Sequence, residues 1–493
     1  MKAQLSLLLT CVLAGQLLLA GESPLKTHPD QLEFPDLQFE PPNADGFRVT
    51  LTNGIPVYIA EDRMFPLVNV RLYFRGGSYL LPDGREGLAG LTGDVWRTGG
   101  AGDLDARALD EEIDFLAARL STGIGDITGS VSLNLLSKDL DRGLELMLDV
   151  LLRPRFQEDR LEKAKEDLLA GMKRRNDRAG QIESREWNRL IYGEHFWANR
   201  LPTEATVKSI GRKDLIDFHG SLMNPANMVL VAAGDFDKVA MLAKLKATFG
   251  QLTGTQQALP PVPQPTWKPE PGVYLVDKPD VNQGRVSIGH LGVKLPMKDE
   301  FGLRVANDIL GGGGFTSWLM ANVRSDEGLA YSAGSSSGIA RSYPGVFRAS
   351  FQSKSSTCSR AAQLTTELIG KLISDGVEED ELTTSKNSFI QTFPNWFQTP
   401  IQTVSLYAQD ELIDRPHEYW TTYRENVSEV TRDAVKAAAQ EHIHPDKLVV
   451  LVVGNIDEIL KGHPDHPDAS FEQFGKLVRL PLRDPMTLEP MDK

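Results

Sequence analysis

Cysteine is scarce in this chain, and its scarcity limits how the protein can be stabilised. Only Cys11 and Cys358 occur among 493 residues. Because Cys11 lies in an N-terminal segment that we expect to be removed, the mature chain keeps one cysteine and forms no intrachain disulfide. The folded part must then be held together by its hydrophobic cores, even in an oxidising compartment.

Long apolar runs are also lacking beyond the N-terminus. There, Lys2 precedes an apolar segment over residues 5–20, and small and polar residues follow at 21–23. This order is typical of a secretory signal peptide. The run is shorter than the roughly 20 residues that a bilayer-spanning helix needs. We therefore expect cleavage near Ala20 or Gly21, an exported and most simply periplasmic bacterial protein, and no stable membrane span.

Positive charge is in short supply as well. The chain has 53 lysines and arginines against 67 aspartates and glutamates, a formal net charge of −14, and no lysine- or arginine-rich run on a face that could neutralise a phosphate backbone. Such a chain has no surface suited to a phosphate backbone, so nucleic acid is not expected as a partner. With 41% hydrophobic and 24% charged residues, the composition is that of an ordinary folded protein, and its length predicts two sizeable cores.

An internal repeat divides the chain. Residues 225–237 (PANMVLVAAGDFD) align without gaps on residues 445–457 (PDKLVVLVVGNID), an offset of 220. Each segment predicts a buried strand that ends in a turn, and each follows a predicted helix, at 212–220 and at 432–440. The repeat therefore indicates a duplicated domain.

The two halves also begin alike, because residues 57–74 and 273–292 each predict a strand, a turn and a second strand. Amphipathic helices are predicted at equivalent places in both halves, at residues 135–152, 158–175, 361–374 and 379–392. We predict an α+β fold of two homologous domains related by internal duplication. Each is expected to be a mixed, mainly antiparallel sheet packed on helices.

A proline-rich stretch separates the repeats. The prolines of residues 258–271 exclude a helix and favour an extended, semi-rigid connector. The predicted organisation is a signal peptide (1–21), an N-terminal extension (22–46), a first domain (47–257), the linker (258–271), a second domain (272–480) and a tail (481–493).

Three segments of the first half carry a family likeness. Residues 51–58, 75–78 and 84–100 resemble the M16 family of pitrilysin-, insulinase- and mitochondrial-processing-peptidase-like metallopeptidases. The resemblance implies that residues 84–100 contain the helix which, in active members, carries the motif His-x-x-Glu-His. Its two histidines bind zinc and its glutamate activates a water molecule.

The residues of this chain at the motif positions are Gly90, Gly93 and Asp94. Neither imidazole nor the general base is present, and a glycine side chain supplies no ligand. The resemblance therefore implies a degenerate zinc motif, with no metal and no other cofactor bound by this chain.

The third zinc ligand of active members, a glutamate on a later helix, aligns with Ala170 or Gly171. Neither residue can bind a metal. Glu166 lies within one turn of that position, but a lone carboxylate on a charged helix is more simply a solvated residue.

The segment after four consecutive glycines in the second half predicts a helix with one apolar face. That face would consist of Phe315, Trp318, Leu319 and Val323. Arg324 points away from it, and Gly328 ends the helix before a strand that contains Tyr331. Arg324 and Tyr331 are therefore expected to converge at a helix–strand corner.

Residues 307–317 and 323–332 resemble the second M16 signature. The resemblance implies that Arg324 and Tyr331 are catalytic residues, which bind the substrate carbonyl and stabilise charge in the tetrahedral intermediate. The alternative is an arginine in a surface ion pair and a tyrosine at the edge of a core.

Two glycine patterns invite other interpretations. The glycines at 311–314 are not followed by the Lys-Ser/Thr of a phosphate loop, so nucleotide binding is not expected. The resemblance instead implies a hinge or substrate-binding loop at Gly312, Gly313 and Gly314. Residues 334–338 match a nucleophile elbow, but a strand is predicted after them, which argues against Ser336 as a nucleophile.

M16 proteins of this size act as pairs of two-domain chains that enclose unfolded peptides. The resemblance implies that this chain is the non-zinc Arg/Tyr subunit of a heterodimeric zinc metallopeptidase, inactive alone, and that it acts on peptides or unfolded polypeptides. A partner subunit with His-x-x-Glu-His would hold the zinc and pair with the substrate along a sheet edge. The alternative is a catalytically inactive scaffold or peptide-binding protein of the same fold.

Overall fold

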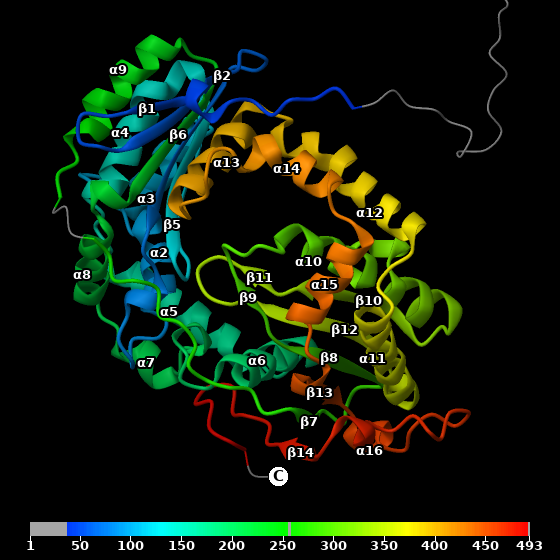
Figure 1. The fold of residues 1–493 in the computed structure, drawn as a ribbon. Coiled ribbons are helices and arrows are strands. Elements are labelled where there is room, and N and C mark those ends of the chain that lie inside the picture. Colours follow the sequence, from blue (N-terminus) through cyan, green and yellow to red (C-terminus); the bar gives the residue numbers. More distant parts are fainter. Residues whose placement is uncertain (1–36, 255–257, 492–493) are drawn as a thin grey trace, which may run out of the picture. The chain divides into compact units, whose positions relative to one another are not determined.

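Two six-stranded sheets form the framework of the protein (Figure 1). The computed structural model describes residues 37–254 and 258–491. The predicted signal peptide over residues 1–21 lies outside this described part. From Pro41 onward the chain forms one compact unit.

The first sheet has the strand order β1-β2-β6-β3-β5-β4. Its strands are β1 (Arg48–Thr50), β2 (Pro56–Glu61), β3 (Leu67–Arg75), β4 (Arg119–Ile124), β5 (Thr128–Leu136) and β6 (Met228–Gly234). The β2–β6 pair is parallel and the other four pairs are antiparallel. On the central strand, Val70 lies opposite Leu133 on one side and Ala232 on the other, and all three are buried.

The second sheet has the order β10-β12-β8-β13-β7-β14. Its strands are β7 (Gly272–Asp277), β8 (Gln283–Leu291), β10 (Ala330–Ser337), β12 (Val346–Lys354), β13 (Val449–Gly454) and β14 (Leu477–Leu480). Pairs β13–β7 and β7–β14 are parallel, and the rest are antiparallel. Two short strands, β9 (Val293–Lys294) and β11 (Ile339–Ala340), pair in parallel beside this sheet.

Five strands of each sheet share one topology, because the order β2-β6-β3-β5-β4 is repeated as β7-β13-β8-β12-β10. The helices before β6 and β13, α8 (Arg212–Leu222) and α15 (Arg432–His442), also lie at the offset of the sequence repeat. The prediction of two mixed, mainly antiparallel sheets related by duplication is confirmed.

Helices α2 (Leu88–Thr98) and α4 (Leu140–Leu152) pack on the first sheet, against β4 and β5 respectively. The other α-helices of the described residues are α3 (Ala106–Phe115), α5 (Glu158–Lys173), α6 (Ala179–Tyr192), α7 (Glu204–Ser209), α9 (Lys238–Thr248), α10 (Glu300–Asn307), α11 (Cys358–Ser374), α12 (Glu379–Thr392), α13 (Pro400–Leu412), α14 (Tyr419–Ser428) and α16 (Ile456–Ile459).

The predicted helix over 135–152 begins too early. Leu135 and Leu136 belong to β5, whose residues alternate between buried and half-buried positions up to its last residue. This period of two continues the sheet, and the helix starts at Leu140 after one 3-10 turn.

Each half contributes one helix to the sheet of the other half, which the sequence did not predict. Helix α6 packs on β8 and β13 of the second sheet, whereas α13 packs on β2, β3 and β6 of the first (Figure 1). Both contacts bury apolar side chains, such as Ile182 and Trp187 of α6 beside Leu451 of β13. The helices that cover each sheet therefore come from both sides of residues 258–271.

Residues 258–271 contain no helix or strand. Tyr79 Oη donates a hydrogen bond to the carbonyl of Pro260 at 3.2 Å, and Trp197 Nε1 donates to that of Pro263 at 3.0 Å. These bonds fix the stretch on the aromatic side chains beneath it.

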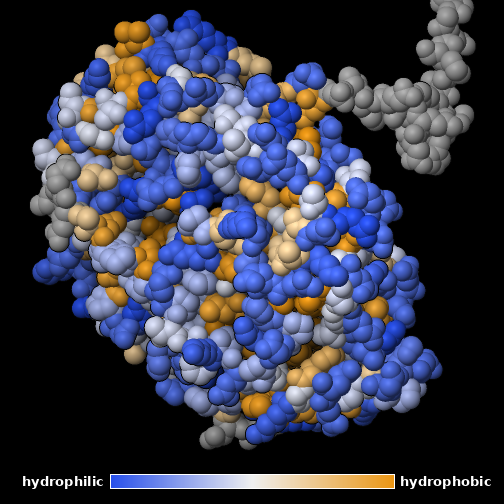
Figure 2. All heavy atoms as spheres, in the orientation of Figure 1, coloured by the Kyte–Doolittle hydropathy of each residue, from blue (hydrophilic) through white to orange (hydrophobic). Residues whose placement is uncertain are grey.

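The described residues include no helix that is both long and apolar enough to cross a bilayer. On the face drawn in Figure 2, hydrophilic side chains predominate and apolar ones gather in separate patches.

Candidate functional site

Arg324 lies on a π-helix, Leu319–Asp326, that follows the glycine-rich loop. Trp318, Leu319 and Val323 are buried in the core of the second half, as predicted. Phe315 departs from the prediction, because 76% of its surface is exposed. It lies in a separate 3-10 turn, Gly314–Thr316, and so does not share the buried face of the helix.

The Arg324 guanidinium contacts two aromatic rings. Its Cζ atom lies 4.9 Å from the centroid of Phe315 and 5.4 Å from that of Tyr331. Among the described residues it has neither a hydrogen bond nor an ion pair, so its five N–H donors are available to a ligand. The ion-pair alternative for Arg324 therefore finds no support in this geometry. The sequence predicted that Arg324 and Tyr331 would meet, and the structure places them together.

Tyr331 is 81% exposed on the edge strand β10. The pairing of β10 with β12 shifts here, from Ala330 opposite Ser353 to Ser332 opposite Gln352, and Tyr331 falls between these pairs. Such a bulge turns a side chain away from the regular alternation of the strand. The tyrosine consequently faces Arg324 instead of a core.

The glycine-rich loop lies against β10. Gly312 ends the short π-helix Asp308–Gly312, Gly313 follows it, and Gly314 has a φ of +61°, which favours glycine. Ser335 Oγ donates to Asn307 Oδ1 at 2.9 Å and so ties the start of the loop to the strand. The loop thereby presents Phe315 to Arg324, while a substrate-binding role for Gly312, Gly313 and Gly314 stays a prediction.

Residues 334–338 do not form a nucleophile elbow. Ser336 lies within β10, and its hydroxyl donates to the carbonyl of Val346 at 3.0 Å. The strand expected from the sequence is present.

The zinc-motif positions lie on α2. Gly90 and Asp94 are exposed, and a Cβ atom built on Gly90 would meet nothing within 4 Å. Gly93 is buried against β4, where a Cβ would lie 2.9 Å from the backbone nitrogen of Ile124. Thr122 Oγ1 also donates to the Gly93 carbonyl at 2.7 Å. Glycine at position 93 therefore lets α2 pack closely on the sheet.

Asp94 is the one carboxylate at these three positions. Although much of it is exposed, desolvation by neighbouring atoms raises the pKa of its carboxyl. A single carboxylate without the histidines does not make the family's zinc site.

The positions of the third ligand lie on α5, which packs beside α2. Ala170, Gly171 and Glu166 are all exposed there. Over residues 37–254 and 258–491, no group of three or more His, Cys, Asp and Glu side chains is placed to hold a metal ion. The residues present at the motif positions do not fit zinc in the manner of active M16 members.

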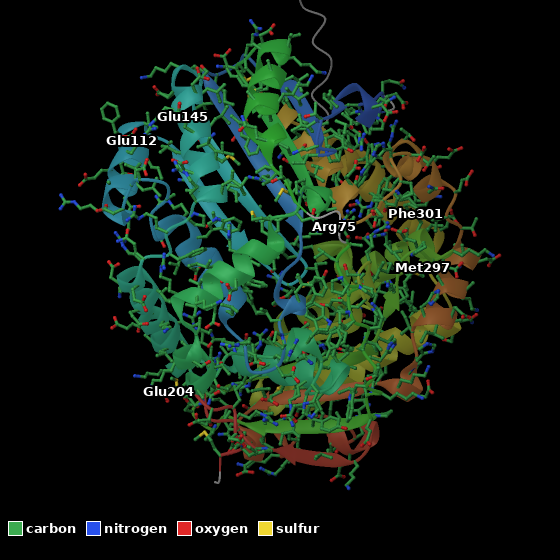
Figure 3. All side chains as sticks on the ribbon, turned by 90° about the vertical axis from the view of Figure 1, so that its left-hand side faces the viewer. Arg75, Glu112, Glu145, Glu204, Met297 and Phe301 are labelled. Carbon is green, nitrogen blue, oxygen red and sulfur yellow. The ribbon has the colours of Figure 1, made fainter. Side chains whose placement is uncertain are left out.

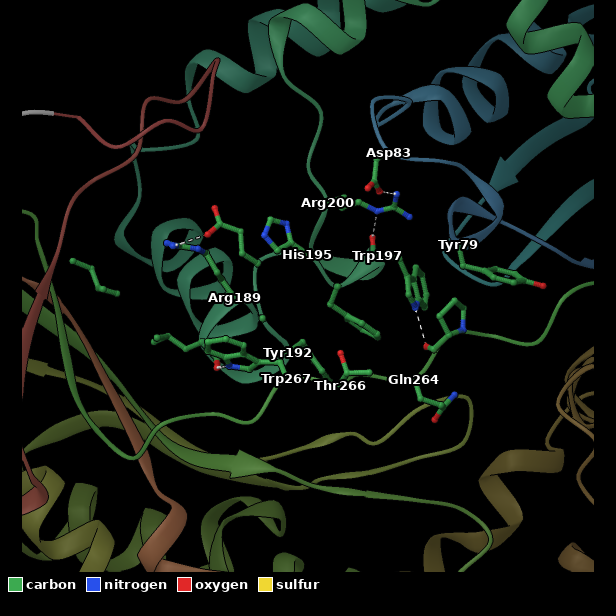
Figure 4. Close-up of a pocket in the computed structure, with 16 residues that line it drawn as sticks. Tyr79, Asp83, Arg189, Tyr192, His195, Trp197, Arg200, Gln264, Thr266 and Trp267 are labelled. Atoms are coloured by element: carbon green, nitrogen blue, oxygen red, sulfur yellow. Dashed lines mark hydrogen bonds and ion pairs between the residues drawn. The ribbon is translucent and has the colours of Figure 1, made fainter.

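A separate cavity of about 610 Å³ is lined by residues of the first half, the linker and Leu480 (Figure 4). Tyr192, Trp197 and Trp267 contribute aromatic surface, and the indole nitrogens of both tryptophans are already hydrogen-bonded, to Pro263 and Leu190. Arg324 and Tyr331 are not among its lining residues. This cavity is therefore distinct from the Arg/Tyr site.

The structure is that of a duplicated α+β protein with an Arg/Tyr corner and without histidine or glutamate at Gly90, Gly93 and Asp94. Residues 209–389 match the family described as "Peptidase M16 inactive domain". The match includes Arg324 and Tyr331 but not α2. The part of the chain that this match covers, residues 209–389, is similar to the inactive domain of M16 peptidases.

Similar proteins cover most of the chain. The "Non-peptidase homolog YmxG" of Helicobacter pylori is 23% identical over 412 residues, which is 81% of this chain and 92% of that protein. The bovine "Mitochondrial-processing peptidase subunit beta" is 25% identical over 278 residues, 55% of each chain. A solved M16 inactive domain from Pseudomonas fluorescens has a TM-score of 0.73 and 24% identity, and the alignment covers 83% of this chain and 97% of that one. The last of these shows the fold.

Proposed function

We propose that this chain is the Arg/Tyr subunit of a heterodimeric, exported M16 zinc metallopeptidase that cleaves peptides in the periplasm. The observation that carries the proposal is Arg324, which has no anionic partner among the described residues and whose guanidinium contacts two exposed rings. The exposed Arg107, by contrast, faces the carboxylate of Glu111 in an ion pair. An arginine held by rings alone keeps its donors for a bound molecule.

The chemistry of this corner suits a peptide carbonyl. Arg324 and the Tyr331 hydroxyl would donate hydrogen bonds to the oxygen of the scissile carbonyl, on which negative charge develops during attack. Contact with the rings restricts the rotamers of Arg324 before the peptide arrives, so less conformational entropy is lost on binding. This chain would thus bind and orient the peptide and stabilise the negative charge on the carbonyl oxygen, without performing the attack itself.

The rest of the chemistry must come from another chain. Gly90, Gly93 and Asp94 supply no zinc site and no general base, so a partner subunit with His-x-x-Glu-His would hold zinc and activate the water. The bovine relative is itself named as a subunit of a peptidase, which supports an assembly of this kind.

A non-catalytic scaffold or peptide-binding protein is the second candidate. The name of the Helicobacter pylori relative, a non-peptidase homolog, favours it. Under this function the Arg324 corner would bind peptides without contributing to cleavage.

The test is peptidase activity on a quenched-fluorescent peptide, with zinc content, for the purified chain alone and after mixing with a chain that carries His-x-x-Glu-His. We expect activity and zinc in the mixture only, and a loss of at least tenfold in kcat with Arg324→Ala. Arg63→Ala, a change at an arginine whose side chain is 63% exposed in the first half, is the control and should have no effect.

Two results would overturn the proposal. Stoichiometric zinc with chelator-sensitive cleavage by the chain alone would contradict the inference that Gly90, Gly93 and Asp94 supply no zinc site. Full activity of the Arg324→Ala mixture would instead favour the scaffold or peptide-binding function.

A further inference from the structure

A second cavity, of about 770 Å³, lies where segments of both halves meet the linker. It is bordered by the end of β3 at Arg75, the end of α13 at residues 412–414, the linker at 258–264, and the paired strands β9 and β11. Figure 3 shows Arg75 near the middle of the view, whereas Glu112 and Glu145 lie at its rim. Its volume is in the range of sites that hold small molecules or a few peptide residues.

The apolar wall of this cavity is preformed. It consists mainly of linker residues and of Tyr79 and Ile127. Besides the bonds from Tyr79 and Trp197 to proline carbonyls, Gln264 Nε2 donates to the carbonyl of Ser342 at 2.9 Å. The linker is thereby bonded to both halves, and Figure 4 shows the bond from Trp197 of the first half.

The charged residues of the lining are three cations, Arg75, Lys294 and Arg341, and one carboxylate, Asp414. Arg75 is engaged, because its guanidinium donates to Asp414 Oδ1 at 2.8 Å and to the carbonyls of residues 411 and 412 at the C-terminal end of α13. This arginine offsets the carboxylate and the negative end of the helix dipole.

The other two cations lack an anionic partner. Lys294 Nζ contacts only the neutral amide oxygen of Gln264, at 3.4 Å. Arg341 makes no hydrogen bond or ion pair within the described part of the chain, and its Nε is buried without an acceptor. The carboxylate of Asp410 has an electrostatic interaction with Arg341, but it already accepts hydrogen bonds from Arg415 and Trp420.

A buried N–H group without an acceptor, such as Nε of the half-buried Arg341, is costly, and an anionic ligand would remove that cost. The planar fork of arginine matches a carboxylate, and the apolar wall beside it suits a carboxylate attached to an apolar group. In a chain of net charge −14, two free cations in one cavity also favour an anion locally.

We propose that this cavity binds the C-terminal carboxylate of a peptide whose last residues are apolar, with Arg341 and Lys294 as its ligands. The inference is independent of cleavage, and it gives the protein a means to recognise free chain ends.

The test is calorimetric titration of the mature chain alone with an N-acetylated hexapeptide ending in Leu-Leu, as the free acid and as the C-terminal amide. We expect the acid to bind at least tenfold more tightly than the amide. Arg341→Met, which keeps an apolar stem in place, and Lys294→Ala should each weaken binding of the acid by at least tenfold. Lys298→Ala, a change at an exposed lysine in the same segment, is the matched control and should leave it unchanged.

Equal affinity for acid and amide, or no binding of either, would overturn the proposal, as would equal effects of Lys294→Ala and Lys298→Ala. Decanoate is titrated in parallel. If it binds as well as the peptide, the site accepts small carboxylic acids and the assignment to a peptide end is wrong. Because no partner subunit and no cleavage step is involved, failure here leaves the proposed peptidase role untouched, and failure of that role leaves this result interpretable.

Discussion

Glu183 on α6 and Arg348 on β12, 165 residues apart in the chain, are joined by a hydrogen bond of 2.8 Å from the guanidinium to the carboxylate. Only 1% of Glu183 is exposed, and its carboxylate also accepts from Ser287 and Arg285 of β8. This cluster attaches a helix of the first half to the sheet of the second.

Replacing Glu183 with alanine should therefore destabilise the protein strongly. The change leaves two arginines next to a buried surface without their counter-charge, and we expect a loss of about 3–5 kcal/mol in the free energy of unfolding. Urea denaturation followed by circular dichroism measures it. Glu145→Ala, at an exposed ion pair with Arg142, should cost no more than about 1 kcal/mol. Equal losses for the two variants would show that the buried cluster does not secure α6.

The two glycines at the zinc-motif positions should respond to alanine with opposite signs. A methyl group at the exposed Gly90 position meets open space, so Gly90→Ala should stabilise the protein by about 0.5–1 kcal/mol. At Gly93 the same group would press on the backbone of Ile124, and we expect destabilisation of about 1–3 kcal/mol. Thermal or urea unfolding distinguishes them, and a common sign would contradict the packing of α2 on β4.

Phe315 should matter to the Arg324 site although the family signature does not single it out. Removal of the ring by Phe315→Ala frees the guanidinium, and the lost contact, worth about 0.5–1 kcal/mol, should lower kcat of the reconstituted pair about two- to fivefold. Phe315→Tyr should restore activity because it keeps the ring. Phe115→Ala removes another exposed ring, on α3, and serves as the control. An unchanged kcat in Phe315→Ala would show that Tyr331 suffices to hold Arg324.

Stability should fall in mild acid because of two buried histidines. Burial lowers the pKa of His219 and of His290 to about 4, and His290 Nε2 accepts the backbone N–H of His444 at 3.0 Å, which requires a neutral ring. Since the folded pKa lies below the unfolded value of about 6.5, the contribution of each neutral ring is complete above that value. It is lost progressively as the pH falls from about 6.5 towards 4.

Urea midpoints at pH 7, 5.5 and 4.5 measure this loss. His219→Phe, which keeps an aromatic ring beside Trp96, should reduce the fall of the urea midpoint between pH 7 and 4.5. His195→Ala, at an exposed position, should not change this fall. If the urea midpoint of His219→Phe falls with pH as steeply as that of the unaltered protein, the acid sensitivity comes from other groups.

The sequence predicted the parts of this protein that depend on local pattern. Strand alternation and the repeat located both sheets, and the apolar spacing after the tetraglycine placed Arg324 beside Tyr331. The orientation of Phe315 could not be predicted in this way, since a break between two short helical turns decides it and the apolar pattern continues across that break. The packing of α6 and α13 depends on contacts between residues more than 100 positions apart, such as Arg285 with Glu183, which periodicity does not reveal.

Because each sheet is covered by a helix from the other half, the chain cannot complete its folding in the order of its synthesis. Helix α6 leaves the ribosome before any strand that it covers has been synthesised, and α13 leaves it long after the first sheet is complete. Neither half can finish its core in order of synthesis, and the apolar faces of both sheets stay open until the last third of the chain is present. For the export that we propose, this delay would be an advantage, because the polypeptide would stay unfolded until it has crossed the membrane.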